Sequence, residues 1–170
     1  MEQLIKKVYD TFSANQAIFI EKGFTPVSTI DRWRGQTIHP NDFEMYPLPA
    51  MFIEYKITWK KTGKQYEGKV HLGFHVITNE PWGGSSISSN VDEALKDVFY
   101  YKACQALLDD LASDCNGKLY RTGEHPVDTG VICYQVLDYE GNYYDVANTF
   151  NLVPVPDATV QVAGQLVKHL

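Results

Sequence analysis

Two stretches of sequence joined by a short turn decide the fold: AMFIEYKITWK, residues 50–60, and QYEGKVHLGFHVIT, residues 65–78. Apolar and polar side chains alternate along both stretches, which is typical of strands with one buried face. Between them lies Gly63, and glycine adopts the backbone angles of a tight turn without strain. The sequence therefore predicts a long β-hairpin. We expect its buried face to include Ile53, Ile57, Leu72 and Phe74.

A lone hairpin is only marginally stable in water, so other elements must cover its apolar face. The segment Glu2 to Ser13 carries an apolar stripe at helical spacing. A second helix is predicted from about residue 90 to Ala112, followed by a strand at 118–122, a loop at 123–130 and a second hairpin whose turn is 140–142. This order predicts an α+β fold, with an antiparallel sheet built on long hairpins and two main helices packed on one face.

Length and composition indicate one ordinary globular domain. We expect residues 1–170 to form a single α+β domain, in which 151–170 are either a C-terminal extension or the last strand. The net charge of −6 argues against a general nucleic-acid binder. The three cysteines follow no CxxC spacing and are expected to be free thiols. No apolar run approaches the length of a membrane span, and the N-terminal residues lack the apolar core of a signal peptide.

The second predicted helix has an apolar pattern that drifts around its axis. Leu95, Val98 and Phe99 share one face and are expected to cover the sheet. Three further side chains lie off that stripe and are expected to contact a neighbouring subunit: Tyr100, Leu107 and Leu111.

Few residues have the spacing of a catalytic or metal-binding site. His71 and His75 share a strand face, but four residues along a strand separate them by about 13 Å, too far to bind one metal ion. Glu124, His125 and Asp128 fall within a predicted loop that could seat a metal or a general base, although a solvated turn is the commoner outcome. No phosphate-binding loop, HExxH or GxSxG motif is present. We therefore expect no catalytic residue, no metal and no cofactor.

Three lysines surround the predicted hairpin tip on an otherwise acidic chain: Lys60, Lys61 and Lys64. Such a group is usually a solvated turn, but it can also serve as a docking point for an acidic partner surface. We expect it to contact a partner subunit rather than nucleic acid.

Several segments in a fixed order carry a resemblance to a known family. They are IDRWRGQ (30–36), YPLPAMFIEY (46–55), the strand containing Trp59, the return strand 65–76, a helix, and Leu119-Tyr120-Arg121 ahead of Glu124 and Asp128. Over residues 1–150 the chain resembles the small prophage-borne proteins related to tail-terminator, or tail-completion, subunits of long-tailed phages.

The resemblance implies an α+β subunit that forms a ring, a hexamer by analogy, at the head-proximal end of the tail. It implies docking to tail-tube and neck proteins, no catalysis and no cofactor. The implied location is the cytoplasm of the bacterial host during assembly and the virion tail afterwards. Two other interpretations stay open: a small α+β enzyme or ligand-binding domain that uses the Glu124–Asp128 loop, and a monomeric adaptor that binds one protein through its hairpin.

Overall fold

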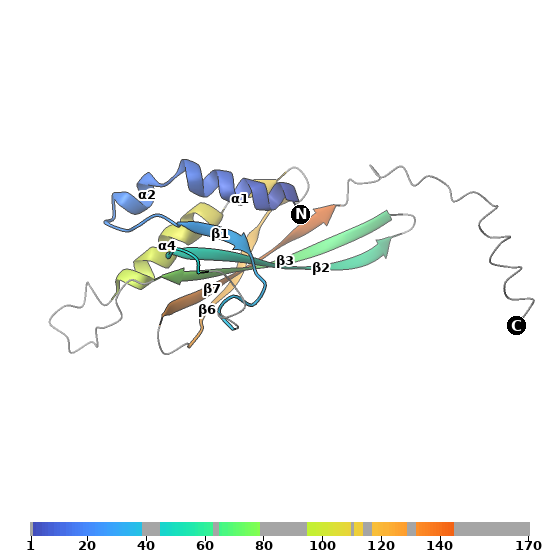
Figure 1. Cartoon of the computed structure of the whole chain (residues 1–170). Coiled ribbons are helices and arrows are strands. Elements are labelled where there is room, and N and C mark those ends of the chain that lie inside the picture. Colours follow the sequence, from blue (N-terminus) through green and yellow to red (C-terminus); the bar gives the residue numbers. More distant parts are fainter. Residues whose placement is uncertain are drawn as a thin grey trace, which may run out of the picture.

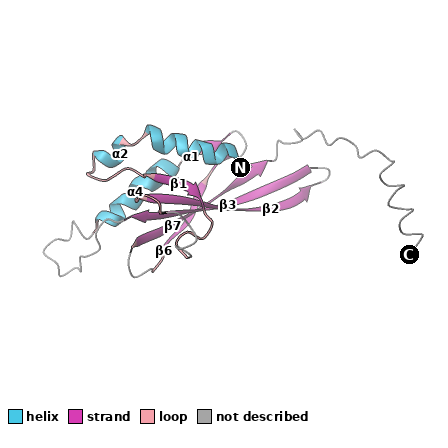
Figure 2. Ribbon diagram, in the orientation of Figure 1, coloured by secondary structure: helices cyan, strands magenta, loops and turns pink. Residues whose placement is uncertain are grey.

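A five-stranded sheet with helices on one face forms the body of the protein (Figure 1, Figure 2). The computed structural model describes residues 2–38, 45–62, 65–78, 95–109, 111–113, 117–128 and 132–144. Within these residues the strand order is β1-β2-β3-β7-β6, beside a small sheet of β4 and β5. The strands are β1 (Thr29–Arg32), β2 (Ala50–Thr62), β3 (Gln65–Thr78), β4 (Ala112–Ser113), β5 (Gly117–Lys118), β6 (Tyr120–Pro126) and β7 (Cys133–Tyr144). The helices are α1 (Glu2–Ala14), α2 (Ala17–Ile20) and α4 (Lys96–Leu108).

The predicted hairpin is confirmed as the centre of the sheet. Strands β2 and β3 pair in antiparallel register from Ala50 opposite Ile77 to Thr62 opposite Gln65. The other side of β3 pairs with β7, and β7 pairs with β6, both antiparallel. Strand β1 pairs with β2 in parallel, so the sheet is mostly but not wholly antiparallel. The α+β fold class is the one that the sequence predicts.

Apolar side chains from alternate strand positions meet the helices in one core. Ile53, Leu72 and Phe74 are buried there as expected, whereas Ile57 is half-buried. Helix α1 begins one residue after Met1 as predicted, and its stripe of Leu4, Val8 and Phe12 packs into the same cluster. The distal part of the hairpin extends beyond the helices (Figure 1). Tyr55 and Trp59 are exposed, although they lie on the face predicted to be buried.

In the part of the chain that the structure describes, the opposite face of the sheet is covered at one end. A second apolar cluster lies there, formed by Ala50, Phe52, Ile77, Tyr134 and Val136 from the strands, with Trp33, Tyr46, Leu48, Val127 and Ile132 packed over them. Toward the hairpin tip, this outer face carries charged and polar side chains instead. The same strands therefore carry an apolar cluster at one end and a polar surface nearer the hairpin tip.

The C-terminal half of the sheet differs from the prediction. Strand β7 runs without a break through the predicted turn at 140–142, because Glu140 bonds Lys69 and His71 on β3 and Gly141 lies opposite Val70. Strand β6 extends to Pro126, so the predicted loop at 123–130 is wrong for its first four residues. The predicted second hairpin needs a return strand after its turn, at about 143–150. Of these residues only 143 and 144 are described, as the end of β7, and the segment 151–170 lies outside the described residues.

Helix α4 turns a different face to the sheet from the one predicted. The residues assigned to a neighbour are buried within the chain: Tyr100 is 0%, Leu107 9% and Leu111 5% exposed. Tyr100 packs against the rings of Phe19 and Phe24, at centroid distances of 5.3 and 5.6 Å. The interface prediction for these three residues is therefore wrong. The helix is apolar on both sides, so its periodicity could not indicate which side faces the core.

Candidate functional site

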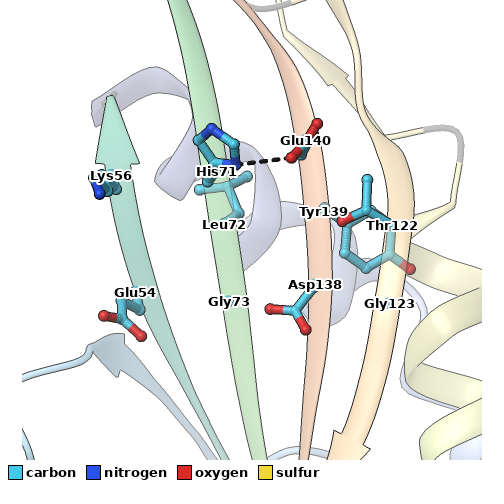
Figure 3. A pocket seen from close by; sticks show the side chains of 10 residues that line it. All are labelled: Glu54, Lys56, His71, Leu72, Gly73, Thr122, Gly123, Asp138, Tyr139 and Glu140. Atoms are coloured by element: carbon cyan, nitrogen blue, oxygen red, sulfur yellow. Dashed lines mark ion pairs between the residues drawn. The ribbon is translucent and has the colours of Figure 1, made fainter. Parts of the chain in front are cut away.

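A polar recess of about 380 Å³ lies on the outer face of the sheet, across four strands (Figure 3). One cross-strand row places Glu54, Gly73, Asp138 and Gly123 side by side. The two glycines carry no side chain, so the two carboxylates border an open space rather than a packed surface. A register shift between Arg121 and Gly123 displaces β6 at the edge of this outer recess, as β-bulges commonly do beside functional surfaces.

Histidine–carboxylate pairs line the same face. His71 Nδ1 lies 2.9 Å from Glu140 Oε1, and His125 Nδ1 lies 3.3 Å from Asp138 Oδ2. Lys69 also bonds Glu140, and this contact, ahead of the nearby charges of Lys69 and His71, lowers the pKa of the Glu140 carboxyl. Glu140 is therefore ionised at neutral pH, and the recess presents anionic oxygens to solvent.

His75 lies between the recess and the apolar cluster beside it, and it contacts residues of both. Its ring stacks on Trp33 with centroids 4.1 Å apart and planes 3° apart. Nδ1 lies 2.5 Å from the Tyr134 hydroxyl and Nε2 lies 3.0 Å from Glu54 Oε2. A neutral imidazole fits both contacts, since the Tyr134 O–H can donate to Nδ1 while Nε2–H donates to Glu54. Burial lowers the pKa of His75, although the bond to Glu54 opposes that shift.

The residues of the enzyme interpretation do not come together. Glu124 and His125 are neighbours on strand β6 and point to opposite faces of the sheet. The Glu124 carboxylate accepts a hydrogen bond from Gln105 on α4, whereas His125 contacts Asp138 on the outer face. Across the described residues, no three His, Cys, Asp or Glu side chains are grouped as metal ligands. The Glu124–Asp128 segment therefore does not form the single site that this interpretation requires.

The hairpin tip exposes two of the three predicted lysines. Lys60 and Lys61 are exposed near the end of β2, and Lys64 lies outside the described residues. The tip lies at the end of the sheet away from the helices (Figure 1). Because Lys60 is six residues beyond Glu54 and four beyond Lys56 on the same strand, it lies about 20 Å from Glu54 and about 13 Å from the near edge of the outer recess. The tip lysines Lys60 and Lys61 therefore lie apart from the carboxylates of this recess, whereas Lys69 on β3 bonds one of them, Glu140.

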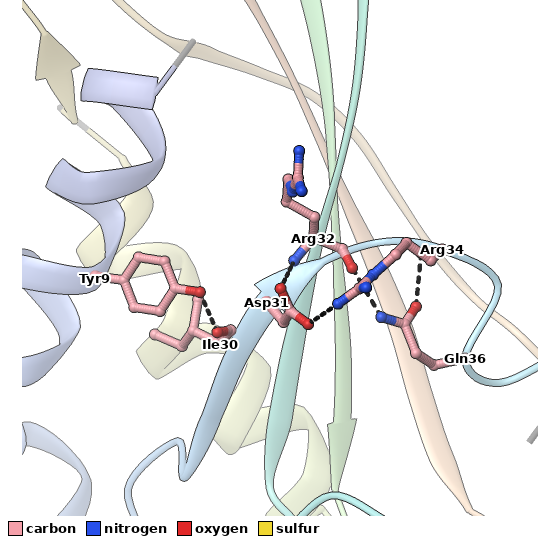
Figure 4. Close-up of polar contacts among 6 residues, drawn as sticks. All are labelled: Tyr9, Ile30, Asp31, Arg32, Arg34 and Gln36. Carbon is pink, nitrogen blue, oxygen red and sulfur yellow. Dashed lines mark hydrogen bonds and ion pairs between the residues drawn. The ribbon is translucent and has the colours of Figure 1, made fainter. Parts of the chain in front are cut away.

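A groove of about 370 Å³, here called the α1 groove, separates α1 from β1 and β2. Its lining residues are Glu2, Ile5, Tyr9, Asp31, Arg32 and Tyr55. Figure 4 shows how polar contacts hold its β1 wall: the Tyr9 hydroxyl donates to the Ile30 carbonyl, and Arg34 pairs with Asp31 at 2.5 Å. The Gln36 amide bonds both the Arg32 carbonyl, at 2.8 Å, and the Arg34 N–H, at 2.7 Å.

An exposed apolar surface on α4 was not predicted from the sequence. On α4 and its N-cap, Leu95, Val98, Phe99, Lys102 and Ala106 face solvent, and we call them the α4 outer stripe. Leu95 and Val98 are each 40% exposed and Phe99 is 44% exposed, where burial against the sheet was predicted. The apolar residues of the outer stripe recur every three or four residues, and so do those of the buried face. The sequence pattern therefore does not indicate which of the two faces is exposed.

Comparison with known proteins gives a fold relationship and no family. No family model matches the sequence. A search of the curated proteins finds no match either. Among solved structures, the chain is similar to one from a structure described as the virion of a native gene transfer agent (GTA) particle. The TM-score is 0.50 at 14% sequence identity, over 84% of this chain and 96% of that chain.

That similarity shows a shared fold, and it spans nearly all of the GTA chain. No described helix has both the length and the apolar character needed to cross a membrane.

Proposed function

We propose that this protein is a structural subunit of a phage-type tail, similar to a tail terminator, acting as a single α+β domain. In this role it associates with copies of itself into a ring, a hexamer by family resemblance, and docks to tail-tube and neck proteins. The observation that carries the proposal is the fold shared with a GTA virion chain across 96% of that chain's length. The sequence resemblance over residues 1–150 supports it independently.

The surfaces of the chain suit a protein that works by docking. The hairpin extends beyond the helix layer and ends in exposed lysines, while the outer recess offers carboxylates on another part of the molecule. Electrostatically complementary surfaces guide association and fix register more than they add affinity. A chain with separate basic and acidic surfaces can therefore orient itself against partners of either charge.

A non-enzymatic role follows from the same proposal. The groups of the outer recess bond one another in histidine–carboxylate pairs, and the Glu124–Asp128 segment is divided between two faces of the sheet. The acidic chain also suits a ring that DNA passes through, because like charge repels phosphate.

Deleting the gene from the producing cell tests the proposed function. We expect heads and tails that are made but fail to join into complete particles, and electron micrographs will show them separately. A plasmid copy of the wild-type gene should restore complete particles. Normal yields of complete, infectious or gene-transferring particles from the deletion strain would contradict the proposal.

A further inference from the structure

Helix α4 is apolar on both of its faces, and among the described residues only one of these faces is buried against the rest of the protein. Its buried face packs on the sheet and on Phe19 and Phe24. Its outer stripe nevertheless carries Leu95, Val98 and Phe99 in solvent. Helices that are apolar all round are normally buried all round. The outer stripe therefore has the character of a surface that is covered in the assembled state.

The α1 groove has matching chemistry. Ile5, Tyr9 and Tyr55 give it an apolar lining, and Tyr9 and Tyr55 are 38% and 42% exposed. Its rim holds two carboxylates, Glu2 and Asp31, and one cation, Arg32. Asp31 also pairs with Arg34, so Glu2 is the exposed carboxylate of the rim that can attract a cation from another chain. The α4 outer stripe carries one cation, Lys102, whose Nζ lies 5.8 Å from the centroid of the Phe99 ring. The apolar side chains beside Lys102 on α4 thus match an apolar groove that has one carboxylate, Glu2, exposed on its rim.

The two surfaces cannot meet within one chain. The first turn of α4 lies at the end of the sheet away from the hairpin tip, whereas the N-terminal part of α1 lies toward the hairpin (Figure 1). A contact between unlike surfaces on opposite parts of identical chains is head-to-tail, and such contacts close into rings when the rotation permits.

We propose that the α4 outer stripe of one copy binds in the α1 groove of the next copy. This inference rests on the proposed function, because it names the contact that would build the proposed ring. Leu95, Val98 and Phe99 enter the groove against Ile5, Tyr9 and Tyr55. Lys102 of the first copy then lies near Glu2 of the second, where opposite charges favour this register over the reverse one.

The contact is small, and its size predicts how the ring assembles. With about two-fifths of each apolar side chain exposed, the stripe offers on the order of 200 Å² of apolar surface, against about 800 Å² per partner in a stable interface. One such contact holds two free chains together only weakly. The ring therefore forms where the tail end arranges several copies at once, which raises their effective concentration.

Cysteine trapping of the purified full-length chain tests the inference. Leu95→Cys and Ile5→Cys are made separately in a Cys115→Ser background, with an affinity tag on one variant so that mixed and like pairs differ in mass. Cys104 and Cys133 are buried and stay in place. Under mild oxidation at high protein concentration, we expect a disulfide-linked dimer from the mixture, at least several times more abundant than from either variant alone.

Two results would overturn the inference. A dimer from Leu95→Cys alone, as abundant as in the mixture, would show that two α4 stripes meet symmetrically. No dimer above that of a control mixture, in which Ile5→Cys is replaced by Tyr120→Cys on the far edge strand, would show that the stripe does not reach the groove. Unchanged circular dichroism spectra and melting temperatures establish that each variant is folded.

A charge exchange tests the register. Lys102→Glu or Glu2→Lys alone should lower the yield of the mixed dimer about two- to fivefold, as expected for one exposed ion pair. Combining Lys102→Glu on one chain with Glu2→Lys on the other should restore it. If the combination lowers the yield further, Lys102 does not face Glu2. Failure of both trapping tests alongside a positive gene-deletion result would mean that the protein builds particles through another contact.

Discussion

Phe74 occupies the middle of β3, where strands on both sides and helices above enclose it. Its side chain is fully buried, and its ring meets Tyr139 edge-on with centroids 5.5 Å apart. Replacing it with alanine leaves a cavity that the surrounding strands cannot fill. We expect Phe74→Ala to lower the free energy of unfolding by about 3–5 kcal/mol. Urea denaturation measures this, with Tyr120→Ala on the exposed edge strand as a control that should change little.

His75 should make the stability of the protein depend on pH. Burial lowers its pKa below the ordinary 6.5, against the opposing effects of Glu54 and Asp138. The unfolded chain therefore binds the proton more tightly than the folded protein does. As the pH falls below 6.5, the unfolded state takes up protons first and the free energy of unfolding decreases. Above that pH both states are neutral at this residue, and its effect on stability vanishes.

Denaturation of wild type and His75→Gln between pH 5 and pH 7.5 tests this. We expect the wild type to lose more stability on acidification than the variant does, because the variant has no imidazole to protonate at this position. The other histidines of the chain are present in both proteins. An identical dependence on pH in the two proteins would show that His75 binds its proton equally well when folded and unfolded.

At the scale of single elements, the β2–β3 hairpin ends in a basic tip that we expect to bind a partner. The double variant Lys60→Glu/Lys61→Glu should fold normally, since both side chains are exposed. It should nevertheless reduce the number of complete particles when it replaces the wild type in the producing cell. Lys7→Glu/Lys22→Glu is a matched control, with the same change of charge on exposed residues away from the tip.

Full particle yield from the Lys60→Glu/Lys61→Glu variant would remove the tip from the docking surface. A gel-shift titration of the wild-type protein with duplex DNA is a separate check. Binding of DNA that depends on Lys60 and Lys61 would reverse the assignment of the partner from protein to nucleic acid.

The elements also show what the sequence could and could not predict. The hairpin was predictable because alternation along β2 and β3 is a local signal, and a slip of one residue would expose every core side chain. The path of β7 was not, because Glu140-Gly141-Asn142 has the composition of a turn while its pairing with Lys69 and His71 depends on a distant strand. Long-range pairing prevailed over local propensity.

The orientation of helix α4 and the position of the outer recess could not be predicted from the sequence, for related reasons. The two faces of α4 are similarly apolar, so the sequence does not indicate which face packs on the sheet. The prediction that Tyr100, Leu107 and Leu111 contact a neighbouring subunit is wrong for this reason, because all three are buried within the chain. The recess depends on Glu54, Gly73, Asp138 and Gly123 lying in one row across four strands. No spacing along the chain indicates such a row until the register of the sheet is known.

At the scale of the whole molecule, the chain has surfaces of different character at its two ends. The apolar stripe of α4 lies at one end, and the basic hairpin tip lies at the other (Figure 1). A subunit of this kind suits repeated head-to-tail contacts, with the hairpin left to engage a further partner. We propose that copies of this chain form a ring in the tail of a phage-type particle.

Cryo-electron microscopy of the complete parent particle tests whether this ring exists. We predict a ring of density at the head-proximal end of the tail into which the five-stranded sheet fits once per subunit, with α4 of each subunit beside α1 of the next. Absence of density for this chain at that position would contradict the claim.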